Sequence, residues 1–164
     1  MDAWWHEVWL TLQTEFSDIG NAQHVTQITL RLLIAALLGG VLGFEREHKG
    51  KAAGVRTHML VAMGAALFVL VPQMSGAEED AMSRVVQGVI AGIGFLGAGT
   101  ILKGRSEEHE QDVKGLTTAA GLWMTAAIGI AAGLGKESTA VLSTVLALVV
   151  FSVMPRIVGI FEKP

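Results

Sequence analysis

Lysine and arginine residues fall on alternate connections between the apolar segments of this chain. The segments are rich in Gly and Ala and number five, at residues 29–44, 59–71, 85–102, 116–134 and 139–154. Nine of the twelve Lys and Arg residues follow the first, third or fifth segment: Arg46, Lys49, Lys51, Arg56, Lys103, Arg105, Lys114, Arg156 and Lys163. The other three are Arg31, Arg84 and Lys136. Because cytoplasmic loops carry an excess of Lys and Arg, this alternation predicts five membrane spans, with the N-terminus outside and the C-terminus in the cytoplasm.

The length of the apolar segments supports this interpretation. A helix needs roughly 17–25 apolar residues to cross a hydrocarbon core about 30 Å thick. The third and fourth segments reach this length unaided, whereas the second and fifth need flanking residues. A bundle of buried soluble helices is the alternative, but it does not account for the alternating charges. We therefore expect an all-α membrane protein with about five transmembrane helices in a compact, Gly/Ala-rich bundle over residues 28–156.

Each end of the chain carries a short segment outside this bundle. Apolar side chains of residues 3–19 share one helical face, and three of them are Trp. Trp is enriched where a membrane meets water, so residues 1–27 are expected to hold an interfacial helix on the outer surface, broken at Gly20–Asn21. A helix that caps the bundle by packing alone is the alternative. Pro155 is expected to end the last helix, which leaves residues 157–164 as a short cytoplasmic tail.

The composition disfavours several classes of function. The chain has no Cys, which excludes disulfides, thiolate metal sites and a Cys nucleophile. A formal net charge of −3 argues against nucleic-acid binding. No pattern of Ser, His and acidic residues typical of a hydrolase is present, so we expect no enzymatic activity.

Small residues recur four positions apart within the spans. The pairs are Gly39/Gly43, Gly88/Gly92 and Gly129/Gly133. In lipid, helices associate through close van der Waals contact, and small residues permit that approach. The pattern predicts a tight bundle with a self-association face.

Four glycines, Gly92, Gly94, Gly97 and Gly99, lie within eight residues of the third span. Each Gly in a helix interior costs about 1 kcal/mol relative to Ala. One interpretation is a broken helix whose free carbonyls line a cavity and contact an ion. The other is a straight helix with close neighbours, which we favour. The stretch also matches G-x-G-x-x-G, but no strand precedes it, so it does not indicate nucleotide binding.

The first inner loop holds the densest set of charged residues. We hypothesise that Glu45, Arg46 and Arg56 form a charge network that joins the ends of the first two spans. Gly50 and Gly54 are expected to act as hinges, and Thr57 as the N-cap of the second span. An ordinary solvated loop is the alternative. These charges also include Lys49, Lys51 and Glu47, with His58 beside them.

Arg31 lies about one turn inside the first span. We expect it to extend to the outer headgroups; in the alternative it faces the bundle and pairs there. The acidic residues of the second inner loop, between Glu107 and Asp112, could attract a divalent cation, although a solvated loop is favoured. A polar path through the bundle would have few candidate residues: Arg31, Thr100, Thr117, Thr118 and Thr125.

Three separated motifs resemble the MgtC/SapB family. The first runs from Leu30-Arg31-Leu32 through Phe44-Glu45-Arg46-Glu47 to Gly54-Val55-Arg56-Thr57-His58. The second is the glycine cluster, which continues to Ile101, and the third is Val113-Lys-Gly-Leu-Thr-Thr-Ala-Ala120 followed by Trp123. The positions that match are Arg31, Glu45, Arg46, Glu47, Gly54, Arg56, Thr57, His58, Gly92, Gly94, Gly97, Gly99, Lys114, Gly115, Thr117 and Thr118.

The resemblance implies a bacterial inner-membrane protein tied to magnesium limitation. Members are linked to growth at low Mg²⁺ and to survival inside host cells, and some restrain the F-type ATP synthase. Many members carry a soluble C-terminal domain, and this chain is expected to be a short form without it.

Two functions follow as expectations. In the first, the Gly-rich bundle transports Mg²⁺ or another ion, with Mg²⁺ as ligand or substrate and no other cofactor. In the second, the protein conducts nothing and regulates another inner-membrane protein. Besides the lipid bilayer, the expected partner is a second copy of the chain, because small-residue faces also suit a homo-oligomer.

Overall fold

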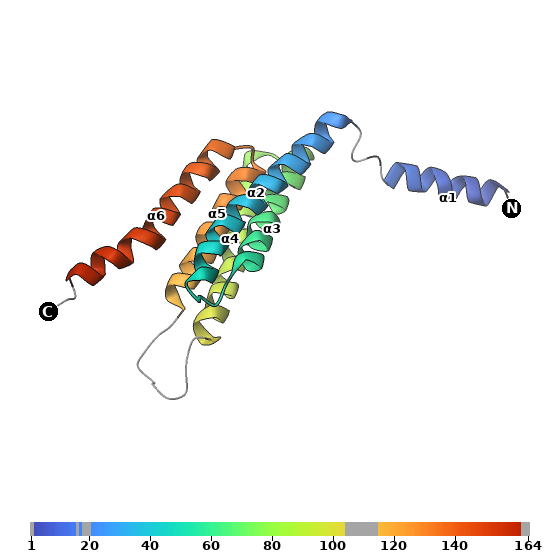
Figure 1. Ribbon diagram of the computed structural model, residues 1–164. Coiled ribbons are helices and arrows are strands. Elements are labelled where there is room, and N and C mark those ends of the chain that lie inside the picture. The colour runs from blue at the N-terminus through green and yellow to red at the C-terminus, as the bar shows by residue number, and fades with distance from the viewer. Residues whose placement is uncertain (1, 16, 18–20, 104–114, 162–164) are drawn as a thin grey trace. The chain divides into compact units, whose positions relative to one another are not determined.

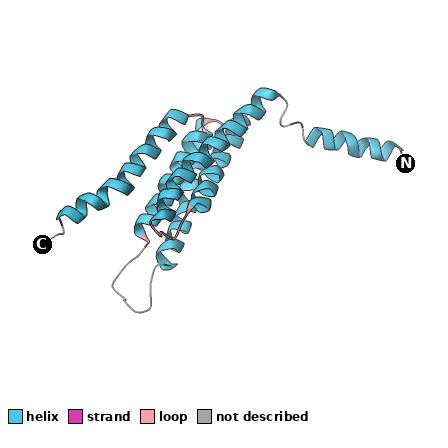
Figure 2. Cartoon of the chain, viewed as in Figure 1, coloured by secondary structure: helices cyan, strands magenta, loops and turns pink. Residues whose placement is uncertain are grey.

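The computed structural model describes residues 2–15, 17, 21–103 and 115–161. Within these ranges the chain forms helices joined by short turns and contains no strand (Figures 1 and 2). The helices are α1 (Asp2–Glu15), α2 (Ala22–His48), α3 (Val55–Met74), α4 (Glu79–Lys103), α5 (Leu116–Gly133) and α6 (Glu137–Phe161). The predicted all-α class is thereby confirmed. Residues 1–30 and 31–164 form two units, which are described separately.

The first unit holds α1 and the start of α2. Helix α1 is described from Asp2 to Glu15, and its Trp4, Trp5 and Trp9 side chains are exposed. The end of the expected helix and its break at Gly20 fall on residues 16 and 18–20, which lie outside the described residues. The side chain of Asn21 caps the N-terminus of α2, since its Oδ1 accepts a hydrogen bond of 2.8 Å from the backbone N–H of His24. The location of α1 at a membrane surface stays a prediction.

Helices α2 to α6 are each long and apolar enough to cross a membrane, which confirms the five predicted spans. Their outward surfaces carry large apolar side chains, such as Phe44 and Phe95, the latter 81% exposed. Apolar surface on this scale suits lipid rather than water. The chain is therefore a multi-span membrane protein.

Helix α5 is the centre of the second unit. It packs against α3, α4 and α6, and half of its residues are buried. The main apolar cluster draws on α2, α3, α5 and α6, and its buried members are Ala35, Leu42, Ala62, Ala66, Ile128, Ala132, Ala140, Ala147 and Phe151. A smaller cluster of Ala65, Ile93 and Ala126 joins α4 to this core. Most of these side chains are small, so the helices pack with little space between their backbones.

Two of the three small-residue pairs serve this close packing. A Cβ atom added to Gly39 would lie 2.6 Å from the carbonyl oxygen of His58, and one added to Gly43 would lie 2.6 Å from Cα of Val55. Gly129 and Gly133 approach the backbone of α3 just as closely. Gly88 and Gly92 differ, because a Cβ on either would meet no other atom of the described chain within 4 Å.

The glycine cluster of the third span is helical throughout. Helix α4 continues without a break from Glu79 to Lys103, as in the favoured interpretation, and presents no unwound segment. Only Gly97 of the cluster has a close neighbour, since a Cβ there would lie 3.3 Å from Cβ of Ala119 on α5. A Cβ added to Gly94 or Gly99 would meet no other atom of the described chain within 4 Å.

The expectation that Pro155 ends the last helix is wrong. Helix α6 passes through Pro155 and ends at Phe161, within the segment expected to be a tail. Pro72 also lies inside a helix, near the end of α3. Membrane helices tolerate Pro where other groups satisfy the freed carbonyl, and a Lys side chain does so for Pro155, as described below. Residues 134–136 join α5 to α6 in a tight turn, in which Gly135 adopts a φ of +74°.

Candidate functional site

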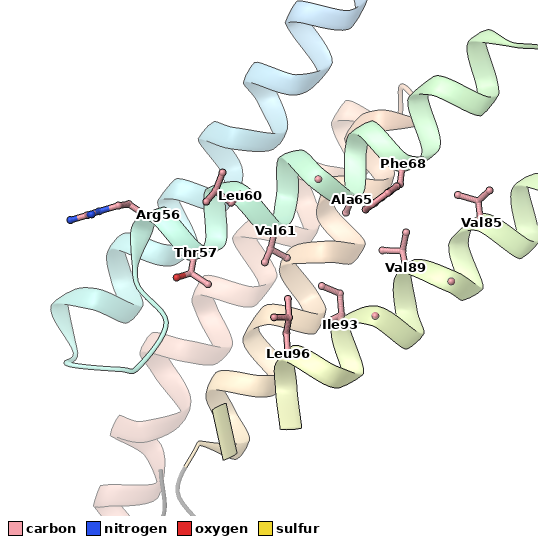
Figure 3. Close-up of a pocket in the computed structure, with 13 residues that line it drawn as sticks. Arg56, Thr57, Leu60, Val61, Ala65, Phe68, Val85, Val89, Ile93 and Leu96 are labelled. Atoms are coloured by element: carbon pink, nitrogen blue, oxygen red, sulfur yellow. The ribbon is translucent and has the colours of Figure 1, made fainter. Parts of the chain in front are cut away.

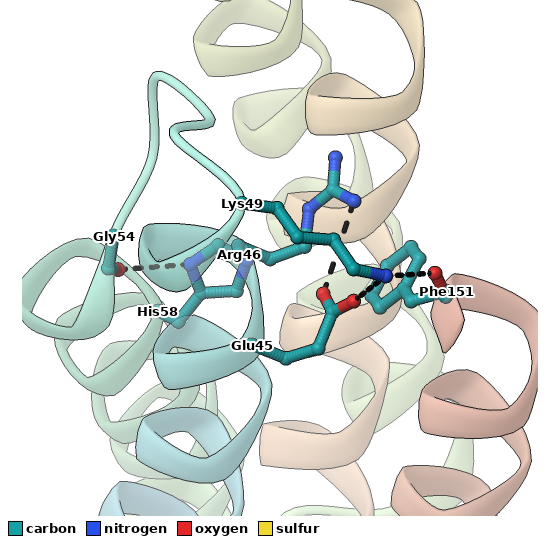
Figure 4. A network of polar contacts seen from close by, with 6 residues as sticks. All are labelled: Glu45, Arg46, Lys49, Gly54, His58 and Phe151. Carbon is teal, nitrogen blue, oxygen red and sulfur yellow. Dashed lines mark hydrogen bonds and ion pairs between the residues drawn. The ribbon is translucent and has the colours of Figure 1, made fainter. Parts of the chain in front are cut away.

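Charged and polar side chains converge at one end of the bundle (Figure 4). Helix α2 contributes Glu45 and Arg46 from its last turn, and Lys49 follows directly after the helix. His58 comes from the first turn of α3, and Phe151 from α6. We call these five residues the buried charge cluster, although the Lys49 side chain is 36% exposed and Phe151 is uncharged.

Lys49 links α2 to α6. Its ammonium pairs with the carboxylate of Glu45, one helical turn earlier, and donates a 2.5 Å hydrogen bond to the carbonyl oxygen of Phe151. In a regular helix that carbonyl would accept from the N–H four residues later, but this position is Pro155, which has no N–H. The Lys49 side chain therefore supplies the donor that Pro155 lacks.

Arg46 is the most buried charge of the cluster, with only 2% of its surface exposed. Its Cζ lies 4.5 Å from the centre of the Phe151 ring, a cation–π contact. Its Nη1 lies 3.9 Å from Oε2 of Glu45. The Nε and Nη2 atoms have no hydrogen-bond partner among the described residues.

His58 is fully buried beside this arginine. Its Nδ1 lies 3.0 Å from the carbonyl oxygen of Gly54. A carbonyl can only accept, so this contact requires a proton on Nδ1. The other ring nitrogen, Nε2, faces α5 at Gly121, where an added Cβ would lie 3.8 Å away, and it has no partner in the described chain.

Unpartnered polar atoms distinguish this cluster from ordinary packing. A buried donor or acceptor without a partner costs about 1–3 kcal/mol, more when it is charged. Such atoms are uncommon in native structures and are concentrated where function or bound water requires them. The cluster is therefore the strongest candidate functional site of the described chain.

Glu47 and Gly54 join α2 to α3 beside the cluster. Oε2 of Glu47 accepts a 2.8 Å hydrogen bond from the backbone N–H of Val55, the first residue of α3. Gly54 is the N-cap of α3, so the expectation that Thr57 takes this role is wrong. A side chain at Gly54 would displace the Glu47 carboxylate, and thereby its hydrogen bond from Val55.

Arg56 takes no part in the buried charge cluster, contrary to the hypothesis of a network with Glu45 and Arg46. Arg56 and Thr57 are both exposed, and Arg56 makes no hydrogen bond or ion pair within the described ranges. The reason is the rotation of α3, which turns His58 inward and its two predecessors outward. Lys49 takes the place we assigned to Arg56, and it binds α6 rather than α3.

Arg31 lies at the opposite end of the second unit and faces the bundle. Its Nη1 donates to Oε1 of Gln73 at 2.7 Å and to the carbonyl oxygen of Gly133 at 2.9 Å. Its Nε lies 4.0 Å from Oε1 of Glu137. The expectation that Arg31 extends to the outer headgroups is therefore wrong, because α3, α5 and α6 all present acceptors to it.

The third motif lies partly outside the described residues, which exclude Lys114 and the acidic segment 107–112. Gly115 has a φ of +97° and packs against the carbonyl of Thr100. Thr118 is buried and Thr117 is exposed. No group of three or more His, Asp or Glu residues in the described ranges is placed to hold a metal ion.

Sequence reasoning missed Lys49 as a member of the cluster, and Phe151, Gln73 and Glu137 as partners. A signal for Phe151 was present, because Pro155 inside an apolar segment marks the carbonyl four residues earlier as free. For Gln73 and Glu137, which are distant from Arg31 in the sequence, we find no local signal.

The two polar ends of the unit are separated by apolar packing. Arg31 and Arg46 are fifteen residues apart on α2, about 22 Å along the helix axis. Between them lie Ala35 and Leu42, and the main apolar cluster surrounds these residues on every neighbouring helix. The buried hydroxyls of Thr125 and Thr144 each donate to a carbonyl of their own helix.

Comparison with known proteins places the chain in a family. The MgtC family model matches residues 32–160. The chain is 45% identical to Protein SrpB of Synechococcus elongatus over 138 residues, 79% of this chain and 76% of that protein. It is 38% identical to the Putative magnesium transporter YhiD of Escherichia coli K12, over 80% of this chain and 62% of that protein.

Protein MgtC of Brucella abortus is 41% identical over 128 residues, which cover 78% of this chain and about half (51%) of that protein. No solved structure matches the chain. The match to the family model covers most of α2 and all of α3 to α5, and it includes Glu45, Arg46 and His58. The chain belongs to the MgtC family.

Proposed function

We propose that this protein is a non-enzymatic bacterial inner-membrane protein of magnesium-linked ion homeostasis, and that it regulates another membrane protein rather than carrying an ion through its own bundle. The link to magnesium rests on family membership and on the name of one relative, the Putative magnesium transporter YhiD. The choice of regulation over transport rests on the structure of the second unit.

The observation that carries this choice is the apolar layer between Arg31 and Arg46. Mg²⁺ prefers a near-octahedral set of oxygen ligands and gives up its water reluctantly. The buried apolar cluster between the two polar ends is built mainly of Ala, Leu and Ile side chains, and the Thr125 and Thr144 hydroxyls donate to carbonyls of their own helices. Such an interior is a barrier to a hydrated divalent cation.

The orientation follows from the charge pattern. We propose that the buried charge cluster lies at the cytoplasmic end, because α2 leads from it into the Lys/Arg-rich loop. There it would hold the ends of α2, α3 and α6 as one rigid unit.

A regulatory protein needs a docking surface, and we assign it to the small-residue face of α4. Ala91, Gly94 and Ala98 are exposed and share one side of that helix. A Cβ on Gly94 meets no other atom of the described chain within 4 Å. Small residues allow a neighbouring transmembrane helix to approach closely, either from a second copy of this chain or from the regulated protein.

Flux measurements on the purified protein separate the two functions. In liposomes that trap a Mg²⁺-sensitive dye, we expect the same Mg²⁺ entry as in protein-free liposomes.

In a bacterial strain that lacks the protein, the wild-type chain and Thr125→Val should both restore growth at low Mg²⁺. Gly94→Leu should not, whereas Gly159→Leu, at an equally open position of α6, should restore growth.

Transport is the competing function, because the name of YhiD suggests it. Protein-dependent Mg²⁺ entry that Thr125→Val reduces would establish a path through the bundle and overturn the regulatory proposal.

A further inference from the structure

A long apolar groove runs between α3 and α4 on the outer surface of the second unit (Figure 3). Its volume is about 730 Å³, within the range of roughly 300–1,000 Å³ that is typical of ligand sites. Arg56 and Thr57 line one end, and Phe68 and Val85 line the other. Apart from Arg56 and Thr57 at the first end, the residues that line the groove are apolar or glycine.

Glycine creates the space. Gly64 on α3 and Gly88 and Gly92 on α4 line the groove, and a Cβ on any of them would meet no other atom of the described chain within 4 Å. Large side chains stand at the sides instead. Leu60 is 69% exposed and Phe68 is 64% exposed, so both project beyond the helix backbones.

The length of the groove matches one leaflet of a bilayer. From Arg56 to Phe68 is twelve residues of α3, or about 18 Å at 1.5 Å per residue. The hydrocarbon core is about 30 Å thick, so one leaflet contributes about 15 Å. An acyl chain that begins at the Arg56 end would therefore reach the Phe68 end.

The charged end offers a matching set of donors. The stem of Arg56 lines the groove, and its guanidinium extends away from the apolar walls, as expected for a headgroup contact (Figure 3). Arg56 and Thr57 also lie in the first turn of α3, where backbone N–H groups have no acceptor within the helix. Glu47 accepts from the N–H of Val55, and no other described side chain accepts from the N–H groups of Arg56 and Thr57, which can therefore bind an anion.

We infer that this groove binds one acyl chain of an acidic phospholipid, with the headgroup phosphate held by Arg56 and Thr57. The anion is favoured because Arg56 is the one charged residue among the described residues that line the groove. A helix of a second copy is a poorer occupant, because the projecting side chains of Leu60 and Phe68 would keep its backbone away from the glycines that line the groove. The inference is independent of the regulatory proposal, and its test measures lipid binding alone.

The test is native mass spectrometry of the purified full chain in detergent with added dioleoyl phosphatidylglycerol or dioleoyl phosphatidylcholine. We expect one phosphatidylglycerol per chain, retained at least tenfold better than phosphatidylcholine. Glycerol phosphate, which has the phosphate without acyl chains, should not be retained. Arg56→Gln should abolish the preference for phosphatidylglycerol, and Arg56→Lys should keep part of it.

Two matched pairs give this test its controls. Gly92→Leu fills the groove and should lower retention of both lipids at least tenfold, whereas Gly94→Leu, equally open but not part of the groove, should not. Arg84→Gln removes an exposed arginine outside the groove and should leave the preference intact. Circular dichroism and size exclusion establish that each variant folds, and Gly88→Leu replaces Gly92→Leu if the latter does not.

Equal retention of the two lipids by the wild-type chain would overturn the inference, as would an equal loss in Arg84→Gln and Arg56→Gln. A change of oligomeric state in Gly92→Leu with unchanged lipid retention would assign the groove to a second copy instead.

Discussion

The Lys49 ammonium donates its hydrogen bond to the carbonyl oxygen of Phe151, the group that Pro155 leaves without a helical donor. A side chain just after α2 thus donates the hydrogen bond that a backbone carbonyl of α6 lacks, about one hundred positions later in the chain. The same lysine pairs with Glu45, which itself lies near Arg46. Because these contacts share members, their energies should be coupled.

Lys49→Met should lower the free energy of unfolding by about 1–3 kcal/mol, because it leaves the Phe151 carbonyl and the Glu45 carboxylate poorly satisfied. The measurement is reversible unfolding of the purified protein in mixed micelles. Lys51→Met, which alters an exposed lysine of the same loop, is the control and should have little effect.

A double-mutant cycle with Pro155→Ala tests the cause of that loss. Alanine restores an N–H to which the Phe151 carbonyl can bond, so Lys49→Met should be less destabilising in the Pro155→Ala background than in the wild type. Strictly additive effects would show that the Lys49 contact does not compensate for Pro155.

Arg46→Ala should destabilise the protein by about 3–5 kcal/mol, because it removes a buried cation and leaves Glu45 without one of its two cations. Phe151→Leu removes the aromatic ring under the guanidinium and should cost less, about 0.5–2 kcal/mol for the cation–π contact itself, plus any loss of packing. The same unfolding assay applies, with the exposed Arg156→Ala as control. A silent Arg46→Ala would mean that the cluster is solvated.

Glycine substitutions should have opposite effects at packed and open positions. Gly39→Ala places a methyl group 2.6 Å from the carbonyl oxygen of His58 and should destabilise α2–α3 packing, by about 1–3 kcal/mol if the backbones shift. Gly94→Ala meets open space inside a continuous helix and should stabilise the monomer by up to about 1 kcal/mol.

Gly94→Ala also separates packing from ion binding at the glycine cluster. We expect this variant to retain at least partial function at low Mg²⁺. Complete loss of function in a Gly94→Ala protein that inserts and assembles normally would favour an unwound, ion-binding segment in another state of the protein.

The predicted orientation can be tested with single cysteines, since the natural chain has none. Cysteines at Ser75 and Lys136 should react with an impermeant thiol reagent added to intact spheroplasts, because they lie in the two connections with few cations. A cysteine at Lys51 should react only after the membrane is permeabilised. The reverse pattern would invert the topology.

The linear sequence was enough to predict the all-α class, the five spans and two of the three glycine contacts between helices. Hydropathy is a property of consecutive residues, and a bilayer of fixed thickness converts it directly into spans. Small residues four apart fall on one helix face whatever the tertiary structure, so close packing at Gly39, Gly43, Gly129 and Gly133 could be anticipated. The Gly88/Gly92 pair shows the limit of that pattern, because it lines an open groove instead.

Only the tertiary structure decided which charges meet. Arg46 and Arg56 carry the same charge on either side of one loop, yet the first is buried over Phe151 and the second is exposed beside a groove. Arg31 finds Gln73 and Glu137 because α3 and α6 bring their ends to it, at separations that no local pattern encodes. The physical reason is that a side chain's partner depends on the rotation and crossing of whole helices, and these are set by the packing of small apolar residues across the bundle.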